Sequence, residues 1–561
     1  MAIRESAMSR HLLGAVALIL LLGSCKAPPP QSDAVAAAAA TGPKLFDSFG
    51  DLHRDIGSKV PAAQQYFDQG LRMVYGFNHE AAGRAFAEAA RLDPTCAACV
   101  WGQALVLGPN INLPMDPASA GNATALARRA AQLAAHATPA DRALIEALQA
   151  RYADPAPDHR KPLDLAYAEA MAKVVRDFPG DDDAATLYAE ALMDLAPWAQ
   201  WADGKPTEHT PRVLAELERV LARNPRHIGA MHYYIHATEA SPTPERAIPY
   251  ADALAALAPG SGHLVHMPAH TYIRVGRYHD ATLTNFAATT ADKAFLSFCH
   301  GSNGVYPLGY VPHNWHFASM TAGLTGSRTL ALRAAEETAK RADHAAMGSP
   351  PLEFMQIFVA TPLFAQVRFG QWDAVLAQAQ PPAPLPFPTA IWHFARGMAY
   401  VRTGKQAEAD RELEAMRTIA RDPALAKISF FDINHADAVL AVAVPLLQGE
   451  LLRAQGKPTQ AIAALREAVA AEDKLNYNEP ADWPLPARWY LGAALLETGD
   501  ARGAAEAYRQ DLTTYPDNGW SLHGLAQAQR RLGDAAGAAD SERRYRAAWQ
   551  WADAPLTASR Y

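Results

Sequence analysis

Long apolar runs and one-signed charge blocks are both scarce in this chain. The only extended apolar run, residues 12–22 (LLGAVALILLL), is shorter than the roughly 20 residues that a membrane helix needs. No second run approaches that length, which predicts a soluble body. The net charge is -7, and lysines and arginines are interspersed rather than clustered. Without a basic patch, nucleic acid is not expected as a partner.

Several catalytic signatures are also missing. The chain lacks G-x-S-x-G, P-loop and G-x-G-x-x-G motifs in a strand-to-helix context, and it lacks H-E-x-x-H and paired C-x-x-C zinc motifs. Strand-like alternation of apolar and polar residues is essentially absent. These absences exclude the familiar motif-bearing hydrolases, nucleotide enzymes and zinc proteases, and they favour an all-α fold.

Cysteine is rare, with four in 561 residues. Cys96 and Cys99 form a C-x-x-C that opens a helix instead of following a strand, so a thioredoxin-like role is not expected. A local disulfide in an oxidising compartment is the preferred interpretation, ahead of reduced core residues or metal ligands.

The N-terminus has the layout of an export signal. Arg4 and Arg10 precede the apolar run, and the segment Leu22-Gly23-Ser24-Cys25 follows it. This segment resembles a bacterial lipobox, in which Cys25 would be lipidated; the alternative is an ordinary signal with an incidental cysteine. Lys26, by the same resemblance, favours the outer membrane. We therefore expect a signal peptide over 1–24, a lipidated Ala/Pro-rich linker over 25–44, and a periplasm-facing protein that touches the membrane only through lipid.

A repeat of 34 residues dominates the remaining sequence. A frame begun at Ala63 places small and aromatic residues where a tetratricopeptide repeat (TPR) has them, and frames begun at Leu485 and Gly262 fit as well. The positions that match are Tyr66, Gly70, Ala82, Phe86, Ala89 and Pro94, then Gly492, Ala504, Tyr508 and Pro516, then Ala269, Tyr272 and Ala281. The sequence predicts an all-α solenoid of roughly ten helical hairpins, in which neighbouring hairpins bury each other's apolar faces.

Apolar spacing and turn residues mark individual helices and interruptions. We predict an N-terminal array over 45–345 and a C-terminal array over 346–561, with inserted loops at 296–315 and 476–486. Glycines mark the turns inside hairpins, at Gly276, Gly370, Gly404, Gly456, Gly499 and Gly533. Amphipathic helices are predicted over 79–92, 140–152, 162–177, 211–224 and 244–257.

Histidine is unevenly distributed. Of the 20 histidines, nine lie within residues 232–316, where even spreading would place about three. His232, His236 and Glu239 are spaced i, i+4, i+7, so that on a helix they lie within about 60° of one face. The second trio is His263, His266 and His270, spaced i, i+3, i+7. The two trios lie on the first helices of adjacent hairpins, and in this fold the first helices line the concave surface. His313 and His316 could begin a third helix that carries histidines.

Imidazoles with a carboxylate suit zinc, copper or iron, and a catalytic site keeps one position open. We therefore predict a metal site formed by His232, His236, Glu239, His263, His266 and His270, with Glu239 as ligand or general base. A polar groove without metal and structural histidines remain alternatives. Further candidates for the groove or for supporting positions are His79, Asn110, Asn112, His300, His313, His316, Tyr477, Glu479 and Trp483.

Four blocks resemble a group of bacterial TPR proteins that lack an assigned activity: YGFNHEAAGRAFAEAARLDPTCAACVWGQAL, HYYIHATEAS, GHLVHMPAHTYIRVGRY and IWHFARGMAY. The resemblance covers most of the chain after residue 60. It implies the fold and a groove for a protein, peptide or small ligand, and it supplies no mechanism. Three functions stay open: a ligand-binding lipoprotein that holds a transition metal, a metal-dependent hydrolase or oxidoreductase, and a protein-interaction scaffold for envelope assembly.

Overall fold

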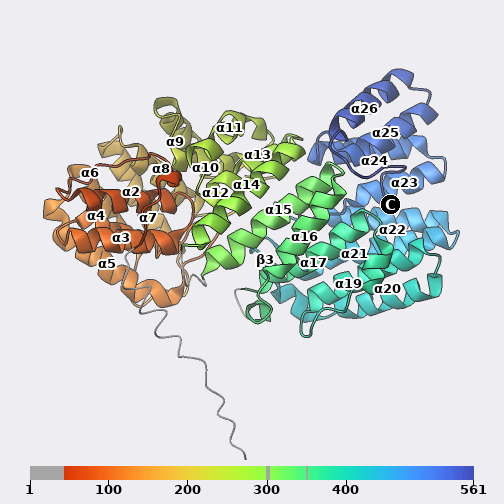
Figure 1. The fold of residues 1–561 in the computed structure, drawn as a ribbon, viewed down its shortest axis with the longest axis horizontal. Coiled ribbons are helices and arrows are strands. Elements are labelled where there is room, and N and C mark those ends of the chain that lie inside the picture. The colour runs from red at the N-terminus through yellow and green to blue at the C-terminus, as the bar shows by residue number, and fades with distance from the viewer. Residues whose placement is uncertain (1–42, 299–303, 349–351) are drawn as a thin grey trace, which may run out of the picture. The chain divides into compact units, whose positions relative to one another are not determined.

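The protein is a helical-hairpin solenoid of the tetratricopeptide type (Figure 1). The computed structural model describes residues 43–298, 304–348 and 352–561, and residues 43–561 form one compact unit. The predicted signal peptide, Cys25 and nearly all of the linker lie outside the described residues. The prediction of an all-α fold is confirmed. In the described part of the chain, no helix combines the length and apolarity that a membrane span requires.

Consecutive helices pack as antiparallel pairs, and each pair also packs on the next. The first half of the array contains α2 (Pro61–Val74) with α3 (His79–Leu92), α4 (Ala97–Leu105) with α5 (Ala120–Leu133), α6 (Pro139–Leu148) with α7 (Lys161–Asp177), α8 (Asp182–Met193) with α9 (Thr210–Arg223), α10 (Ile228–Glu239) with α11 (Ile248–Leu257), α12 (Gly262–His266) and α13 (Pro268–Arg274) with α14 (Tyr278–Leu296), and α15 (Val311–Leu324) with α16 (Arg328–Lys340).

The second half continues in the same way. It contains α17 (Gln356–Arg368) with α18 (Trp372–Ala377), α19 (Pro386–Arg402) with α20 (Gln406–Ala420), α21 (Ala436–Ala454) with α22 (Pro458–Glu472), α23 (Ala487–Glu497) with α24 (Ala501–Thr514), and α25 (Gly519–Arg531) with α26 (Ala535–Ala548). Two short antiparallel ribbons interrupt the helices: β1 (Trp201–Ala202) with β2 (Lys205–Pro206), and β3 (Ser429–Phe430) with β4 (Asn434–His435).

The repeat frame has a direct packing cause. Phe86 of α3 lies against Gly70 of its own hairpin and Gly102 of the next, and a Cβ at either glycine would approach the ring within 2.7 and 2.6 Å. Only glycine leaves room for the aromatic ring, which joins one hairpin to its neighbour. The same arrangement recurs far along the chain at Gly492, Tyr508 and Gly524.

The turn glycines also behave as the sequence predicts. Gly276 and Gly404 have φ of 79° and 76°, a left-handed conformation that ends a helix and that glycine adopts without strain. The remaining predicted turn glycines have positive φ as well: Gly370, Gly456, Gly499 and Gly533.

One predicted loop is wrong in part. No helix interrupts 476–486. Within 296–315, however, residues 299–303 lie outside the described residues, and a π-helical turn spans Tyr306–Tyr310 and leads directly into α15. Pro307 and Pro312 fall in the first turns of these elements, where a missing N–H costs nothing. Burial of the tyrosine rings then overrides the loop-like composition. Two predicted helices have 3₁₀ ends: 140–152 finishes in a 3₁₀ turn over Gln149–Arg151, and 244–257 begins with one over Pro244–Ala247.

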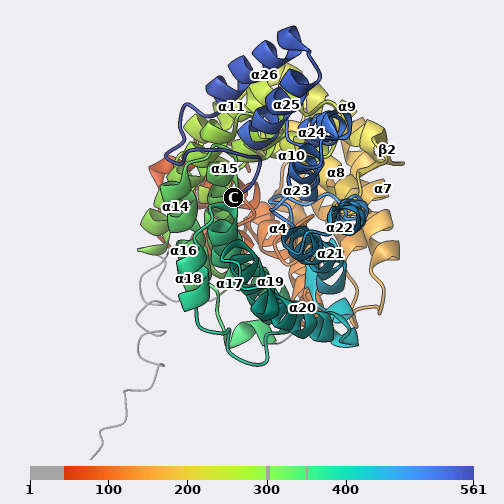
Figure 2. The same ribbon diagram turned by 90° about the vertical axis from the view of Figure 1, so that its right-hand side faces the viewer.

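The C-terminal hairpins return to the middle of the chain. Both views place the α24–α25 turn beside α14, and the Tyr278 hydroxyl donates to the Pro516 carbonyl over 2.7 Å (Figures 1 and 2). A Cβ at Gly276 would lie 2.7 Å from the same carbonyl oxygen. The loop between α22 and α23 lies against α13, which carries His270, one of the predicted site residues.

Candidate metal centre

Six histidines and two glutamates from distant parts of the chain converge inside the solenoid. They are His232, His236 and Glu239 of α10, His263, His266 and His270 of α12 and α13, His313 of α15, and Glu479 from the loop between α22 and α23. All except His313 are at most 6% exposed. They form three groups, two of which share His270, and within each group the ligand atoms lie within 4.8 Å of one another.

The first group consists of His266, His270 and His313. The Nε2 atoms of His266 and His270 are 2.8 Å apart, and the ring of His313 lies 4.9 Å from that of His266. Two metal–nitrogen bonds of about 2.0–2.1 Å, at angles between 90° and 110°, would separate their nitrogens by about 2.9–3.4 Å. The spacing of this pair is therefore close to that of two ligands on one ion.

Hydrogen bonds fix which nitrogen of His266 is available. Its Nδ1 lies 2.7 Å from Oδ1 of Asn285, whose Nδ2 donates to the Ala281 carbonyl. The amide is thereby oriented so that Oδ1 can only accept, so Nδ1 of His266 carries the proton. In a neutral ring the lone pair then belongs to Nε2, which faces His270.

His270 has a corresponding arrangement. Its Nδ1 lies 2.7 Å from Oε2 of Glu239 and 3.0 Å from Oε2 of Glu479. Burial alone would lower the pKa of His270, but the two carboxylates outweigh it and raise the pKa to about 10. At neutral pH the metal-free ring is therefore an imidazolium whose Nε2–H faces His266. If that proton is displaced, the remaining proton belongs on Nδ1 beside the carboxylates, and Nε2 presents a lone pair to His266.

The second group consists of His232, His236 and His263. The Nε2 atoms of His232 and His263 are 3.1 Å apart, and the ring centroids of His232 and His236 are 4.8 Å apart. Burial lowers the pKa of all three rings, and neighbouring imidazoles lower it further, so they are neutral at pH 7. Neutral imidazole is the form that binds metals.

The ring of Phe77 packs on this second group. Its centroid lies 4.5 Å from that of His232, 6.0 Å from His236 and 5.5 Å from His263. The ring of Trp198 also packs on His236 edge to face, with the ring centroids 5.4 Å apart. These aromatic contacts restrict the rotamers of the imidazoles without occupying their nitrogens.

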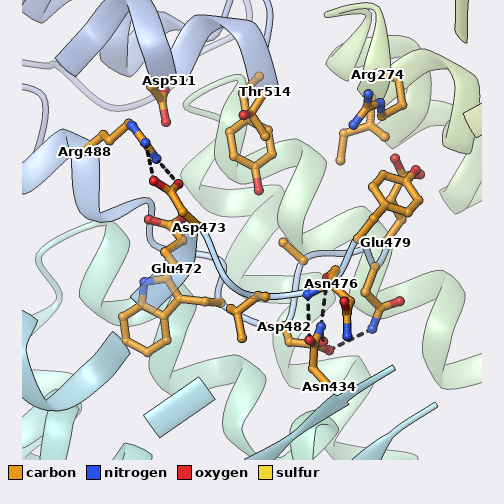
Figure 3. A pocket seen from close by; sticks show the side chains of 17 residues that line it. Arg274, Asn434, Glu472, Asp473, Asn476, Glu479, Asp482, Arg488, Asp511 and Thr514 are labelled. Atoms are coloured by element: carbon orange, nitrogen blue, oxygen red, sulfur yellow. Dashed lines mark hydrogen bonds and ion pairs between the residues drawn. The ribbon is translucent and has the colours of Figure 1, made fainter. Parts of the chain in front are cut away.

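Glu479 reaches the centre from a loop that is held in place by hydrogen bonds. Asn434 accepts from the Asn476 backbone N–H over 2.8 Å and donates to Asp482 over 2.8 Å, while Asn478 donates to the other oxygen of Asp482 over 2.9 Å (Figure 3). The loop also lines a polar pocket of about 260 Å³, shown in Figure 3, with Arg274 and Tyr477 on its wall. Glu479 stands between this pocket and a second, larger cavity.

That second cavity, of about 450 Å³, adjoins both histidine groups. His236 and His263 reach it from one group, His270 and His313 from the other. The rest of its wall is largely apolar and includes Leu113, Pro114, Trp198, Val305, Tyr310, Leu352, Phe354 and Phe431. Its volume is that of a small-molecule pocket.

The structure brings together all six residues that the sequence nominated as metal ligands, and it adds His313 and Glu479 from the supporting candidates. Asn112 lines the large cavity and Tyr477 the polar pocket. Trp483 also lines the polar pocket, where it packs on Phe364 and Phe394. Three others do not join: Asn110 forms a turn with the Asn112 N–H, His79 lies beside Phe77 outside the groups, and His316 faces Phe358. His300 lies outside the described residues.

Three supporting groups had no sequence signal. Asn285 lies in α14, the Tyr75 carbonyl at the end of α2, and Phe77 in the turn before α3; none has a distinctive spacing relative to the histidines. Apart from the centre, the sulfurs of Cys96 and Cys99 are 2.02 Å apart, which is a disulfide bond length.

Comparisons with known proteins add little to this geometry. No family model matches the chain, and no curated protein does. Among solved structures, human IFIT1 bound to m7Gppp-AAAA is 12% identical, with TM-score 0.32, over 90% of this chain and 92% of that one. The P58(IPK) TPR domain is 14% identical, with TM-score 0.22, over 84% and 99%. Yeast Tom70 is 10% identical, with TM-score 0.26, over 85% and 90%. Similarity at this level identifies no family or function, and the fold assignment rests on the helical pairs and their repeat packing.

Proposed function

We propose that this protein binds a transition metal ion through His266, His270 and His313 and presents it to a small ligand in the adjoining cavity. The observation that carries the proposal is the 2.8 Å approach of two Nε2 atoms, with Nδ1 of His266 hydrogen-bonded to Asn285 and Nδ1 of His270 paired with the carboxylates of Glu239 and Glu479. Two lone pairs directed at each other repel. A cation between them removes that repulsion.

A proton is the simplest such cation. In metal-free protein, a His270 imidazolium would donate from Nε2 to His266, with Glu239 and Glu479 as counter-charges. A metal ion uses the same lone pairs and gains the third nitrogen of His313, which the proton does not need. Asn285 and the two glutamates would then act as the outer hydrogen-bond acceptors that orient and polarise metal-bound histidines.

The test uses a matched pair of histidines on one helix. His313 and His316 both lie on α15, but only His313 belongs to the group. Purified without a histidine tag, wild-type protein should carry zinc, copper or iron, measured by elemental mass spectrometry. His313→Ala should weaken the affinity of the His266–His270–His313 site by on the order of 10²–10⁴-fold, because one of three ligands is lost. His316→Ala should retain metal at the wild-type level.

Two results would contradict the proposal. One is wild-type protein that binds no zinc, copper(II) or iron(II) above background after supplementation. The other is equal retention by wild type, His313→Ala and His266→Ala. Circular dichroism and thermal unfolding of each variant establish that a loss of metal does not simply report unfolding.

We also propose that the protein is anchored in the outer membrane through a lipid on Cys25 and faces the periplasm. Lys26, which follows the lipidated cysteine, favours the outer over the inner membrane.

 Support comes from the lipobox-like segment Leu22–Cys25 and the Ala/Pro-rich stretch that follows it. Cells fed an alkyne-labelled fatty acid should yield labelled wild-type protein in the membrane fraction, whereas Cys25→Ser protein should be unlabelled. Equal labelling of the two proteins would contradict the anchor.

A metal-dependent enzyme is the second candidate, and one observation favours it. His313 and His270 border the cavity, so an ion held by three nitrogens would have its open position facing a space that a substrate can enter. Zinc-loaded wild-type protein, assayed with ester and phosphoester substrates beside its metal-free form, separates catalysis from binding alone.

A further inference from the structure

We infer that His232, His236 and His263 hold a second transition metal ion, next to the first, and that Glu239 serves both sites. This inference rests on the proposed function, because it concerns the same buried centre. It goes further in assigning two ions to each chain and in giving one carboxylate a role at both.

The hydrogen bonds of His232 direct one nitrogen toward its neighbour. Nδ1 lies 2.7 Å from the Tyr75 backbone carbonyl, which can only accept, so Nδ1 carries the proton. The lone pair of the neutral ring is therefore on Nε2, 3.1 Å from Nε2 of His263. That separation falls within the about 2.9–3.4 Å expected for two nitrogens bound to one ion.

His236 supplies the third nitrogen. Its Nδ1 lies 3.1 Å from Oε1 of Glu239, which assigns the proton to Nδ1 and the lone pair to Nε2. Among the described residues this buried Nε2 has no hydrogen-bond partner. The ligand atoms of His232, His236 and His263 lie within 4.8 Å of one another, and an unpartnered buried acceptor in such a group is satisfied by a metal ion.

Without a metal ion, more of the buried nitrogens in this histidine cluster are left without a partner. His263 could donate from Nε2 to His232, which would satisfy that pair. Its own Nδ1, which has no partner within the described part of the chain, would then remain a buried acceptor, as would Nε2 of His236. A metal ion bound through three Nε2 atoms leaves Nδ1 of His263 protonated and uses both of the other lone pairs.

Glu239 links the two groups through its two oxygens. Oε1 lies 3.1 Å from Nδ1 of His236, and Oε2 lies 2.7 Å from Nδ1 of His270. The carboxylate thus accepts a hydrogen bond from His236 of one group and forms an ion pair with His270 of the other, and it is 1% exposed. Loss of such an outer acceptor weakens metal binding by about 10–100-fold, so Glu239→Gln should weaken both sites.

The experiment counts ions in the full-length protein. Metal-free wild-type protein titrated with Co(II) should develop visible absorption up to two equivalents, and dialysed zinc-loaded protein should retain two. His232→Ala and His313→Ala should each retain one equivalent, and the double variant none. His79→Ala is the matched control, since that histidine also lies beside Phe77 but belongs to neither group; it should retain two.

The outcomes separate this inference from the proposed function. A wild-type end point at one equivalent, or two equivalents retained by His232→Ala, overturns the second site and leaves the first. Absence of any metal overturns both. If His232→Ala fails to fold, the wild-type end point still decides the question, and Glu239→Gln tests whether both sites weaken together.

Discussion

His270→Ala should lose the ion of the first group and also destabilise the metal-free protein. The ring supplies one of three nitrogens, and if these share roughly 10–16 kcal/mol of binding free energy, its loss costs about 3–5 kcal/mol, on the order of 10²–10⁴ in affinity. The ring is also the cation between Glu239 and Glu479, which lie 2.7 and 3.0 Å from Nδ1. Without it, two buried carboxylates face each other, at a cost of about 3–5 kcal/mol in the free energy of unfolding.

A second substitution separates these two effects. In His270→Ala/Glu479→Gln, one of the facing charges is removed, so the free energy of unfolding should recover toward the wild-type value while metal binding stays lost. Urea unfolding of metal-free proteins measures the first quantity, and competition with a chromophoric chelator measures the second. Wild-type metal affinity in His270→Ala would exclude this ring as a ligand. An unchanged unfolding free energy would show that the carboxylates do not depend on its charge.

Much of the centre could be predicted from α10 and α12–α13 because helical spacing is local. His232, His236 and Glu239 share a face by their i, i+4, i+7 spacing alone, and the repeat frame places the neighbouring helix beside them. The division of the histidines into two groups does not follow from spacing. It depends on rotamers, which are set by partners such as Phe77 and Asn285 on other elements.

The position of Glu479 beside His270 could not be predicted from the sequence. It lies 209 residues after His270, in a loop whose composition resembles a lid or a spacer equally well. Its approach to His270 requires both the return of α24–α25 to α14 and the bonds from Asn434 to the loop. Neither contact has a periodic sequence signal. The solenoid fold was easier to predict from the sequence, because the Gly70–Phe86 packing recurs at a fixed spacing. The helical turn at Tyr306 was not predictable in this way, because it depends on burial between distant elements.

Arg54→Met should be the most damaging substitution outside the metal centre. The guanidinium, 9% exposed, pairs with Asp141 at 2.7 Å, Asp181 at 2.8 Å and Asp183 at 3.4 Å. It therefore joins the segment before α2 to the N-termini of α6 and α8. Removing the cation leaves three carboxylates close together, and we expect a loss of about 3–5 kcal/mol in unfolding free energy at pH 7.

The pH dependence identifies the cause of that loss. Burial alone would raise the pKa of Asp183, but His227, Arg54 and Tyr75 outweigh it and hold the pKa well below its ordinary value. A carboxylate with a depressed folded-state pKa contributes stability that is present above its unfolded pKa, near 3.9, and is lost as the pH falls through the folded value. The difference between wild type and Arg54→Met should therefore shrink as the pH falls below about 4.

The charge network around Arg54 also contacts the proposed second metal site, so metal binding is a second measurement of the effect of Arg54→Met. Asp183 accepts from the Tyr75 hydroxyl over 2.7 Å, and the Tyr75 carbonyl accepts from His232. Arg54→Met protein should thus show weaker binding of the second ion while the first is retained. Arg226→Met, which removes an exposed pair with Asp51, is the matched control and should change stability by less than about 1 kcal/mol. Equal losses in the two variants, or a loss in Arg54→Met that persists undiminished in acid, would rule out the buried charge network as the source.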